Sequence, residues 1–412
     1  MVLGAGVVGL CTAHYLQRRG FRVTVVDREG PKRSSCSYGN AGLIVPSHFI
    51  PLAAPGMVAL GLRCMWNPES PFYLKPRFSA RLINWGWKFW RASTQTRVAR
   101  AAPLLRDLNL ASRAEYEQLV GELDGSFTLV KNGVLLLCNT EHGLHEEACV
   151  AEQGKQLGLP VEVLDARQTA QQDPNVRMNV VGSVMYRCDC HLTPGQVVQS
   201  LQASLESRGI AFRWNTHVDQ VRREGRKIVA FSAAGQELEA DEYVMAAGVW
   251  SDDMLRQIGV NIPMQAGKGY SLTLTNPPRL PRMPSILVEG RVAVTPMGTS
   301  LRFGGTMELA GIETKINPPR VRGIVKSALA YFPDFSEADF AAVEPWCGLR
   351  PCTPDGLPYL GRSTKFDNLT IATGHAMMGM SLGPITGKIA ADLIAGDSPP
   401  FDLQLLSPER YD

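Results

Sequence analysis

The chain has 412 residues, of which 45% are hydrophobic and 20% are charged, with a formal net charge of +3 at pH 7. This composition is typical of a globular protein large enough for two or three domains. Because acidic and basic residues are interleaved and no long run of like charge occurs, we expect no nucleic-acid partner.

The first predicted unit is a glycine-rich turn between a strand and a helix. The opening sequence MVLGAGVVGL places Gly4, Gly6 and Gly9 in the pattern G-x-G-x-x-G. A helix is predicted from about Val7 to Arg19, and the following FRVTVVD alternates as a second strand that ends in Asp27. A strand, this turn, a helix and a second strand with a terminal acid together predict a dinucleotide-binding unit.

Each residue of this unit has a predicted role towards a dinucleotide. Gly4 makes the tight turn, Gly6 lets the backbone approach a pyrophosphate, and Gly9 lets helix and strand pack closely. The helix N-terminus offers free N–H groups and the positive end of its dipole to the phosphates. Asp27 is expected to accept hydrogen bonds from a ribose and to disfavour NADP, whose 2′-phosphate it would repel.

Three features of the sequence concern membranes or export. The apolar stretch Leu43–Trp66 contains three prolines, a histidine and an arginine, so we expect no continuous spanning helix there. No basic segment followed by an apolar one precedes the glycine motif, so we expect no signal peptide. The segment RLINWGWKFWR, residues 81–91, encloses three tryptophans between two arginines. It is predicted either to pack as core or subunit contact or to lie at a membrane interface.

The middle of the chain contains paired β-segments and one cysteine motif. FTLVKNGVLLLC (127–138) and RVAVTPMGTSLRFGGTME (291–308) each predict two strands around a glycine turn. In CDCH the thiols of Cys188 and Cys190 share one side of a strand, which suits a metal or a redox pair. We favour plain thiols, because no second Cys/His pair at ligand spacing occurs, and nine scattered cysteines indicate a reducing compartment.

Four further segments carry a family resemblance. In chain order they are REGPKRSSCSYGNAGLIVP, THVDQVRREGRKIVAFSAAGQELEADEYVMAAGVWS (a predicted β-meander and a buried strand), GLRPCTPDGLPYLG and NLTIATGHAMMGMSLGPITGKIAADLIAG. With the glycine motif, they resemble the FAD-dependent D-amino-acid oxidoreductase family, which holds glycine oxidase, sarcosine oxidase and the bacterial D-amino-acid dehydrogenases. NAGLIVPSHFIPLAAPG and SPFYLKPR are most similar to the dehydrogenase branch, and GHAMMGMSLGP to members acting on D-proline or D-hydroxyproline.

The resemblance implies an α/β fold with two discontinuous domains. A Rossmann-type FAD-binding domain is expected from residues 1–50, 188–262 and 345–412. An α+β substrate domain with an antiparallel sheet is expected from residues 51–187 and 263–344.

It also implies an activity. We expect a D-amino acid to lose a hydride from Cα to the N5 of non-covalent FAD, with electrons passing to a quinone or a carrier protein. The protein is expected in the cytoplasm or on the inner face of the plasma membrane. Two alternatives are an amino-acid oxidase of glycine or sarcosine type that uses O2, and a flavoprotein subunit of an electron-transfer complex.

Three residues are predicted to act on the substrate. Arg350 matches the arginine that clasps the substrate carboxylate in relatives, the alternative being a structural ion pair. Tyr270 is expected to reach a carboxylate or to shield the flavin, the alternative being that it packs at a strand start. His48 is expected to tune the protonation of the amine, because an ordinary histidine pKa lies near neutrality.

A last helix, with Ile385 and Ile389 on its apolar side and Pro384 in its first turn, is expected to point its N-terminus at the flavin. His375 before it is given a structural or flavin-contact role. Sarcosine oxidases link their flavin through a cysteine at the position that Gly348 occupies in this chain. We therefore expect FAD to be bound non-covalently. The predicted cofactor-binding residues are Gly4, Ala5, Gly6, Val7, Val8, Gly9, Asp27, Arg28, Ser35, Asn40, Ala41, Gly42, Leu43, Val218, Ala247, Gly248, Trp250, Gly348, Gly374, His375, Met378, Gly379 and Met380.

Overall fold

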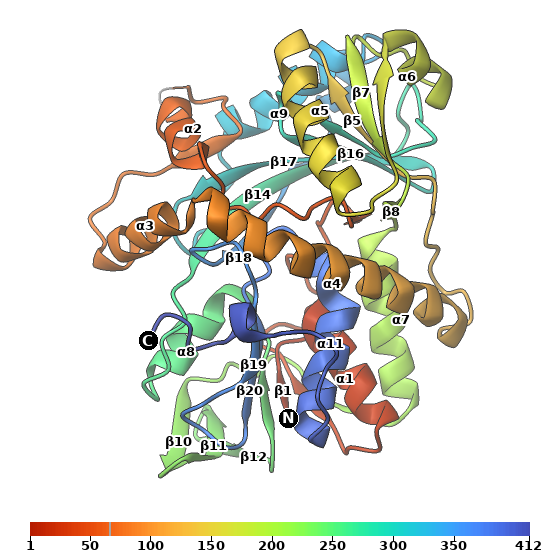
Figure 1. The fold of residues 1–412 in the computed structure, drawn as a ribbon. Helices are drawn as coiled ribbons and strands as arrows, with labels where there is room; N and C mark the ends of the chain where they lie inside the picture. The colour runs from red at the N-terminus through yellow and green to blue at the C-terminus, as the bar shows by residue number, and fades with distance from the viewer. Residues whose placement is uncertain (66) are drawn as a thin grey trace.

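The computed structural model describes residues 1–65 and 67–412, so Trp66, the last residue of the predicted apolar stretch, lies outside the described residues. Two sheets organise the molecule, one in the lower and one in the upper half of Figure 1, and a long helix crosses between them.

The lower sheet confirms the predicted Rossmann-type α/β unit. Its six strands follow the order β19 (Tyr359–Arg362), β20 (Leu369–Thr373), β13 (Tyr243–Met245), β1 (Val2–Leu3), β2 (Thr24–Val26) and β9 (Ala211–Arg213). All neighbours are parallel except the β19–β20 pair. The two-residue β1 is central, and Val2 pairs with Val244 on one side and Val25 on the other. The glycine turn therefore opens at the carboxyl edge of the sheet, where such folds bind ligands.

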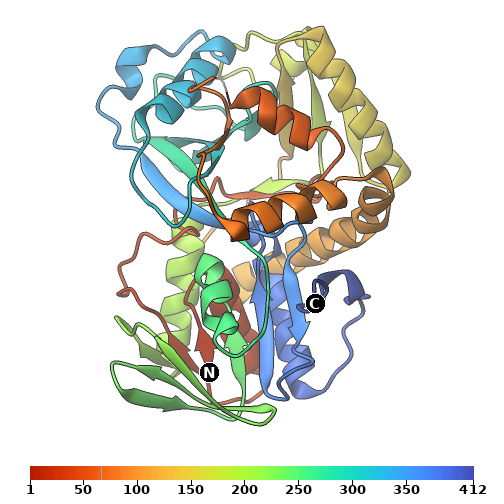
Figure 2. The ribbon, with the colours of Figure 1, turned by 90° about the vertical axis from the view of Figure 1, so that its left-hand side faces the viewer.

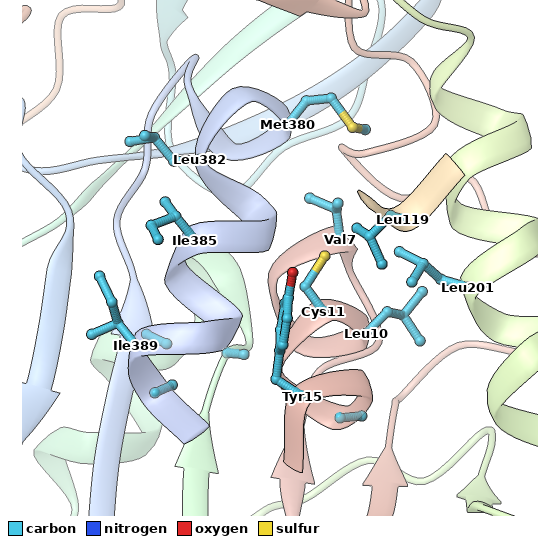
Figure 3. Packing of buried hydrophobic residues seen from close by; sticks show 14 of the residues in the cluster. Val7, Leu10, Cys11, Tyr15, Leu119, Leu201, Met380, Leu382, Ile385 and Ile389 are labelled. Carbon is cyan, nitrogen blue, oxygen red and sulfur yellow. The ribbon is translucent and has the colours of Figure 1, made fainter. Parts of the chain in front are cut away.

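One face of this sheet is covered by α1 (Val7–Arg18), α7 (Pro194–Ser207) and α11 (Gly379–Ala395) (Figure 1). The long helix α4 (Gln95–Glu122) packs against α11. Figure 3 shows Val7 and Cys11 of α1 close to α11. The contact needs glycine, because a Cβ on Gly387 would lie 2.5 Å from the carbonyl carbon of Cys11. The predicted ranges of α1 and of the meander below agree with the structure.

The start of α11 differs from the prediction. The helix begins at Gly379, so Pro384 lies inside it rather than in its first turn. An interior proline leaves the carbonyl four residues earlier without its helical donor. Here the Tyr116 hydroxyl donates a hydrogen bond to that carbonyl, on Met380, at 2.7 Å. A long-range contact thus lets the helix extend past the proline.

The opposite face of the sheet is covered by the predicted meander. Its antiparallel strands are β10 (Gln220–Glu224), β11 (Lys227–Ala233) and β12 (Gln236–Glu239). Phe231 and Leu238 from the meander form one buried cluster with Tyr243 and Met245 of β13.

The upper sheet has nine strands and is mostly antiparallel. Along its main path lie β18 (Trp346–Cys352), β14 (Gln265–Leu274), β17 (Ser300–Leu309), β16 (Val292–Met297), β15 (Ser285–Leu287), β5 (Val134–Cys138), β7 (Gly182–Tyr186) and β6 (Val161–Asp165), while β4 (Phe72–Leu74) pairs with β17. β4–β17 and β5–β15 are parallel. β18 belongs to residues 345–412 yet pairs with β14, and the division into two domains stays a prediction.

One predicted strand pair is wrong and one is confirmed. β16 and β17 form the expected hairpin. The VLLLC run, however, does not pair with FTLV; β5 lies between β15 and β7, and Val130 instead bridges His191. Val134, Leu135 and Leu137 are all buried. An apolar run that is buried on both faces of a sheet is typical of an internal strand with distant partners.

The remaining elements lie around these sheets. They are α2 (Met57–Cys64), α3 (Ala80–Ala92), α5 (Glu141–Gln156), α6 (Ala166–Gln172), α8 (Ser251–Arg256), α9 (Pro318–Tyr331), α10 (Glu337–Phe340) and the short pair β3 (Leu43–Ile44) and β8 (Cys190–His191). Among the helices of residues 1–65 and 67–412, none is long and apolar enough to cross a membrane.

Candidate active site

The glycine turn has no room for side chains at Gly4 and Gly9, whereas a Cβ on Gly6 would meet only the Ser37 hydroxyl oxygen at 3.5 Å. Gly4 has φ +108°, and a Cβ there would lie 2.5 Å from the Ala246 carbonyl oxygen. A Cβ on Gly9 would lie 1.8 Å from the carbonyl oxygen of Gly4. Asp27 ties the turn to the second strand, because its carboxylate accepts hydrogen bonds from the backbone N–H of Ala5 at 2.7 Å and of Glu29 at 2.9 Å.

A cavity of about 520 Å³ opens from this turn. The predicted cofactor residues that line it are Gly4, Gly6, Val7, Val8, Asp27, Arg28, Ser35, Asn40, Val218, Ala247, Gly248, Trp250, Gly348, His375, Gly379 and Met380. Three others, Ala41, Leu43 and Met378, line a second cavity instead. Ala5, Gly9, Gly42 and Gly374 line neither cavity.

Gly42 and Gly374, which line neither cavity, stand where the chain packs too closely for a side chain. A Cβ on Gly42 would lie 2.2 Å from the Leu192 carbonyl oxygen, and one on Gly374 would lie 2.6 Å from a methyl of Thr353. Both have positive φ, where glycine is favoured. Their requirement for glycine is therefore explained by packing of the chain.

The residues of the first cavity fit a dinucleotide. α1 starts at Val7, after its N-cap Gly6, which has no side chain to cap the helix, so the N-terminal end of the helix dipole stays available to phosphate. At one end of the cavity the Arg28 guanidinium lies over the Trp250 ring, 3.5 Å from its centroid, and forms a flat wall for an aromatic base. The Ser37 hydroxyl, which the sequence analysis missed, accepts a hydrogen bond from the Val7 N–H at 3.0 Å.

The three predicted catalytic residues all line a second cavity. Arg350, Tyr270 and His48 come from three distant segments and all line a space of about 1040 Å³. Cys36, Asn40 and Gly348 line both cavities, so the two meet there. A dinucleotide in the first cavity would therefore end at the wall of the second.

Arg350 carries no ionic partner in the part of the chain that the structure describes. Its Nη1 donates a hydrogen bond to the Thr306 carbonyl oxygen at 2.5 Å. No carboxylate lies within ion-pair distance of it among residues 1–65 and 67–412, so the structural ion pair does not form there. A half-buried guanidinium facing a cavity is suited to bind a carboxylate from outside.

Tyr270 reaches a carboxylate of the protein itself. Its hydroxyl donates to Glu308 Oε2 at 2.6 Å, and the Lys268 ammonium lies 3.6 Å from Oε1. Burial, followed by the hydrogen bond to Glu308, raises the pKa of Tyr270. The hydroxyl is thus neutral and oriented by Glu308, a residue that the sequence analysis missed because strand pairing alone brings the two together.

The histidine environments differ from the expectation. Burial lowers the pKa of His48 and of His375 to about 4, so neither imidazole titrates near neutrality. The Nε2 of His375 shares a hydrogen bond of 2.9 Å with Thr386 Oγ1, which fixes its ring at the first cavity. Both rings are neutral at pH 7.

The cysteine motif encloses a buried acid. All nine cysteines are free, and in the described residues no group of three His, Cys, Asp or Glu could hold a metal ion. Between Cys188 and Cys190 stands Asp189, fully buried and bonded to Ser47, which lines the second cavity. The spacing of the motif points only to the thiols, so this carboxyl was not among the predicted site residues.

The chain matches known proteins along its whole length. The model of the DAO family, FAD dependent oxidoreductase, matches residues 1–393. The chain is 33% identical over 423 residues to a D-amino acid dehydrogenase of Granulibacter bethesdensis, covering 100% of this chain and 99% of that protein. A D-amino acid dehydrogenase of Methylobacterium nodulans is also 33% identical, over 420 residues, with 100% and 98% covered.

Solved structures are similar in fold. A glycine oxidase from Geobacillus kaustophilus superposes with a TM-score of 0.80 at 23% identity, covering 100% of this chain and 98% of that one. An L-proline dehydrogenase from P. horikoshii gives 0.74 at 16% identity, with 100% and 96% covered.

Proposed function

We propose that this chain, which belongs to the DAO family of FAD-dependent oxidoreductases, dehydrogenates a D-amino acid to the corresponding imino acid. The observation that carries the proposal is that Arg350, which has no ionic partner among the described residues, lies on a cavity that adjoins the dinucleotide cavity. The full-length relatives named D-amino acid dehydrogenase support the same substrate class.

The chain's own residues bind and orient the substrate. When bound, FAD supplies the two-electron acceptor for a hydride from the substrate Cα. Arg350 clasps the substrate carboxylate, since a planar guanidinium can hold both oxygens at once. The neutral His48 ring offers a nitrogen that can accept a hydrogen bond from the substrate amine. The cavity wall at Tyr270 is kept rigid by its bond to Glu308.

Within this class we propose a cyclic D-amino acid such as D-proline or D-hydroxyproline. The segment GHAMMGMSLGP, on which that resemblance depends, contributes Met377 and Met378 to the cavity wall. Flexible thioether side chains pack well against a ring of saturated carbons.

The electron acceptor is proposed to be a quinone dissolved in the inner face of the plasma membrane. α3 has two faces: Leu82, Trp85 and Phe89 point inward, and the Trp85 indole donates to the Cys352 carbonyl at 2.9 Å. On the other face Ile83, Trp87 and Trp90 are 67%, 52% and 62% exposed. Figure 2 looks onto this helix and its neighbour α2.

The same surface lies at the mouth of the large cavity. Leu62 of α2, Ile83 and the fully exposed Phe78 are exposed hydrophobic residues that also line the cavity. Arg81 lies in the first turn of the helix, where it pairs with Asp253, and Arg91 lies in the last turn, over the Trp87 ring. An apolar face with tryptophans and bordering cations is typical of a helix that lies in a membrane interface, and it would give a lipophilic acceptor direct access.

One experiment tests the activity. Purified holoenzyme is mixed anaerobically with a panel of D- and L-amino acids while the visible flavin absorbance is followed. We expect bleaching by D-amino acids, fastest with D-proline, and slow recovery when air is admitted. Bleaching by L-amino acids alone would overturn the substrate class. Fast reoxidation by O2 would favour an oxidase, and activity only after adding a second protein would favour a complex subunit.

A further inference from the structure

The side chain of Arg350 crosses a neighbouring strand. β18, β14 and β17 lie side by side in that order. Arg350 stands on the outer strand β18, yet its guanidinium donates to Thr306 on β17, two strands away. The arginine therefore spans the middle strand, β14.

The middle strand has a glycine where the arginine crosses it. A Cβ built on Gly269 would lie 2.2 Å from Cζ and Nη2 and 2.3 Å from Nη1 of Arg350. These distances are far inside van der Waals contact, and the group in the way is the planar head of the side chain. Any other residue at position 269 would push the guanidinium away from the sheet.

The acceptor carbonyl sits in a β-bulge. Lys268 pairs with Glu308 and Tyr270 pairs with Gly305. Two residues of β17, at positions 306 and 307, therefore face the single residue Gly269. Bulges of this kind bend a strand and redirect its groups, and they occur frequently next to active sites.

The bulge holds Thr306 in a strained conformation. Its φ is +63°, a region that β-branched residues rarely adopt. The residue is 7% exposed, and its hydroxyl donates to the Gly305 carbonyl at 2.8 Å. Such strain persists only where the surroundings impose it, and it gathers at functional sites.

We infer that Gly269 and the Thr306 bulge are positioning residues that hold the Arg350 guanidinium flat across β14, with its other N–H groups free to face the cavity. The inference rests on the proposed function for the statement that Arg350 binds a carboxylate. The device itself is a steric and hydrogen-bonding relationship, which stability measurements detect without any substrate.

A double-mutant cycle tests the steric half. Gly269→Ala, Arg350→Ala and the double variant are compared by chemical unfolding of the holoenzyme and by steady-state kinetics with the D-amino acid that bleaches the flavin fastest. We expect Gly269→Ala to lower stability only modestly, because the displaced group is the end of a flexible side chain, and to raise KM at least tenfold, with a smaller change in kcat. In the Arg350→Ala background the same substitution should cost little, because the clashing group is gone.

The two possible failures give different results. Equal destabilisation by Gly269→Ala in both backgrounds would overturn the positioning role. The other outcome is that Gly269→Ala costs less stability in the Arg350→Ala background while Arg350→Ala leaves kcat/KM unchanged. That result would show that Arg350 does not bind the substrate carboxylate, and it would leave the positioning relationship intact.

Substitutions at position 306 test the other half. Thr306→Ala keeps a Cβ, which restricts the backbone of the bulge, so we expect KM to change by no more than about twofold, or about 0.4 kcal/mol. Thr306→Gly should raise the unfolding midpoint by relieving strain and yet raise KM more than Thr306→Ala does. The matched control is Ala234→Gly, which relieves a positive φ of +49° in the β11–β12 turn and should leave KM unchanged. A lower KM in Thr306→Gly than in Thr306→Ala would contradict the proposal.

Discussion

Ser47 holds both oxygens of Asp189: its hydroxyl donates to Oδ2 at 2.5 Å and its backbone N–H donates to Oδ1 at 3.0 Å. These bonds favour the ionised carboxylate, and burial opposes it. Burial has the larger effect and raises the pKa of Asp189 to about 7. A carboxyl that titrates near neutral pH is therefore hydrogen-bonded to Ser47, a residue that lines the large cavity.

The first prediction concerns stability against pH. The pKa of Asp189 is raised from 3.8 to about 7, so between these values the unfolded chain releases a proton that the folded protein keeps. As the pH rises between these values, the free energy of unfolding of the wild type should fall by about 1.4 kcal/mol per pH unit through this group, roughly 4 kcal/mol in all. Asp189→Asn should remove that slope. Denaturant unfolding of both proteins from pH 4 to 8 measures the difference, and parallel curves would contradict the assignment.

Ser47→Ala provides the complementary variant. The Ser47 hydrogen bonds lower the pKa of Asp189, so loss of the hydroxyl should raise that pKa. The fall in unfolding free energy should then continue to a higher pH than in the wild type. A shift to lower pH would mean that the hydroxyl stabilises the protonated acid.

The second prediction concerns the turn at the cofactor cavity. Gly9→Ala would bring a methyl 1.8 Å from the Gly4 carbonyl oxygen, so α1 must move away from the turn. We expect a loss of at least about 2 kcal/mol of unfolding free energy and a large fall in bound FAD per chain. Gly121→Ala is the control: the site in α4 has no atom within 4 Å, and it should gain up to about 1 kcal/mol. Equal FAD content in the two variants would argue against the predicted role of Gly9.

The third prediction concerns Arg350. Replacement by alanine should raise KM strongly and lower kcat/KM by roughly two to four powers of ten, because the substrate carboxylate loses its paired charge. Arg226→Ala removes an exposed arginine that pairs with Asp367 and should leave kcat/KM unchanged. Similar kinetics for both variants would remove Arg350 from the substrate site.

The fourth prediction concerns the exposed face of α3. The double substitution Trp87→Ser and Trp90→Ser should lower co-sedimentation with vesicles of equimolar phosphatidylglycerol and phosphatidylcholine by about tenfold or more, because two large apolar side chains leave the interface. Dye-linked activity in solution should not change. Val163→Ser, 43% exposed on β6, is the control and should sediment like the wild type. Unchanged binding of the double variant would contradict membrane docking through α3.

The sequence by itself determined the features that depend on neighbours along the chain. Gly4, Gly9 and Asp27 could be read as a dinucleotide turn because each role needs one residue type at one spacing. The extent of α1 and the β-meander followed in the same way from hydrophobic period and turn residues. The motifs also carried the family resemblance, and with it the prediction of FAD, which the family match confirms.

Only the tertiary structure decided the features that depend on residues distant in sequence. The partners of β5 are set by burial on both faces, and α11 continues through Pro384 because Tyr116 satisfies the freed carbonyl. Arg350 was predicted from its motif, but its path over Gly269 to Thr306 arises from the order of three strands. The acidity of Asp189 likewise depends on how completely the surrounding chain excludes water, and that is a property of packing rather than of any local pattern.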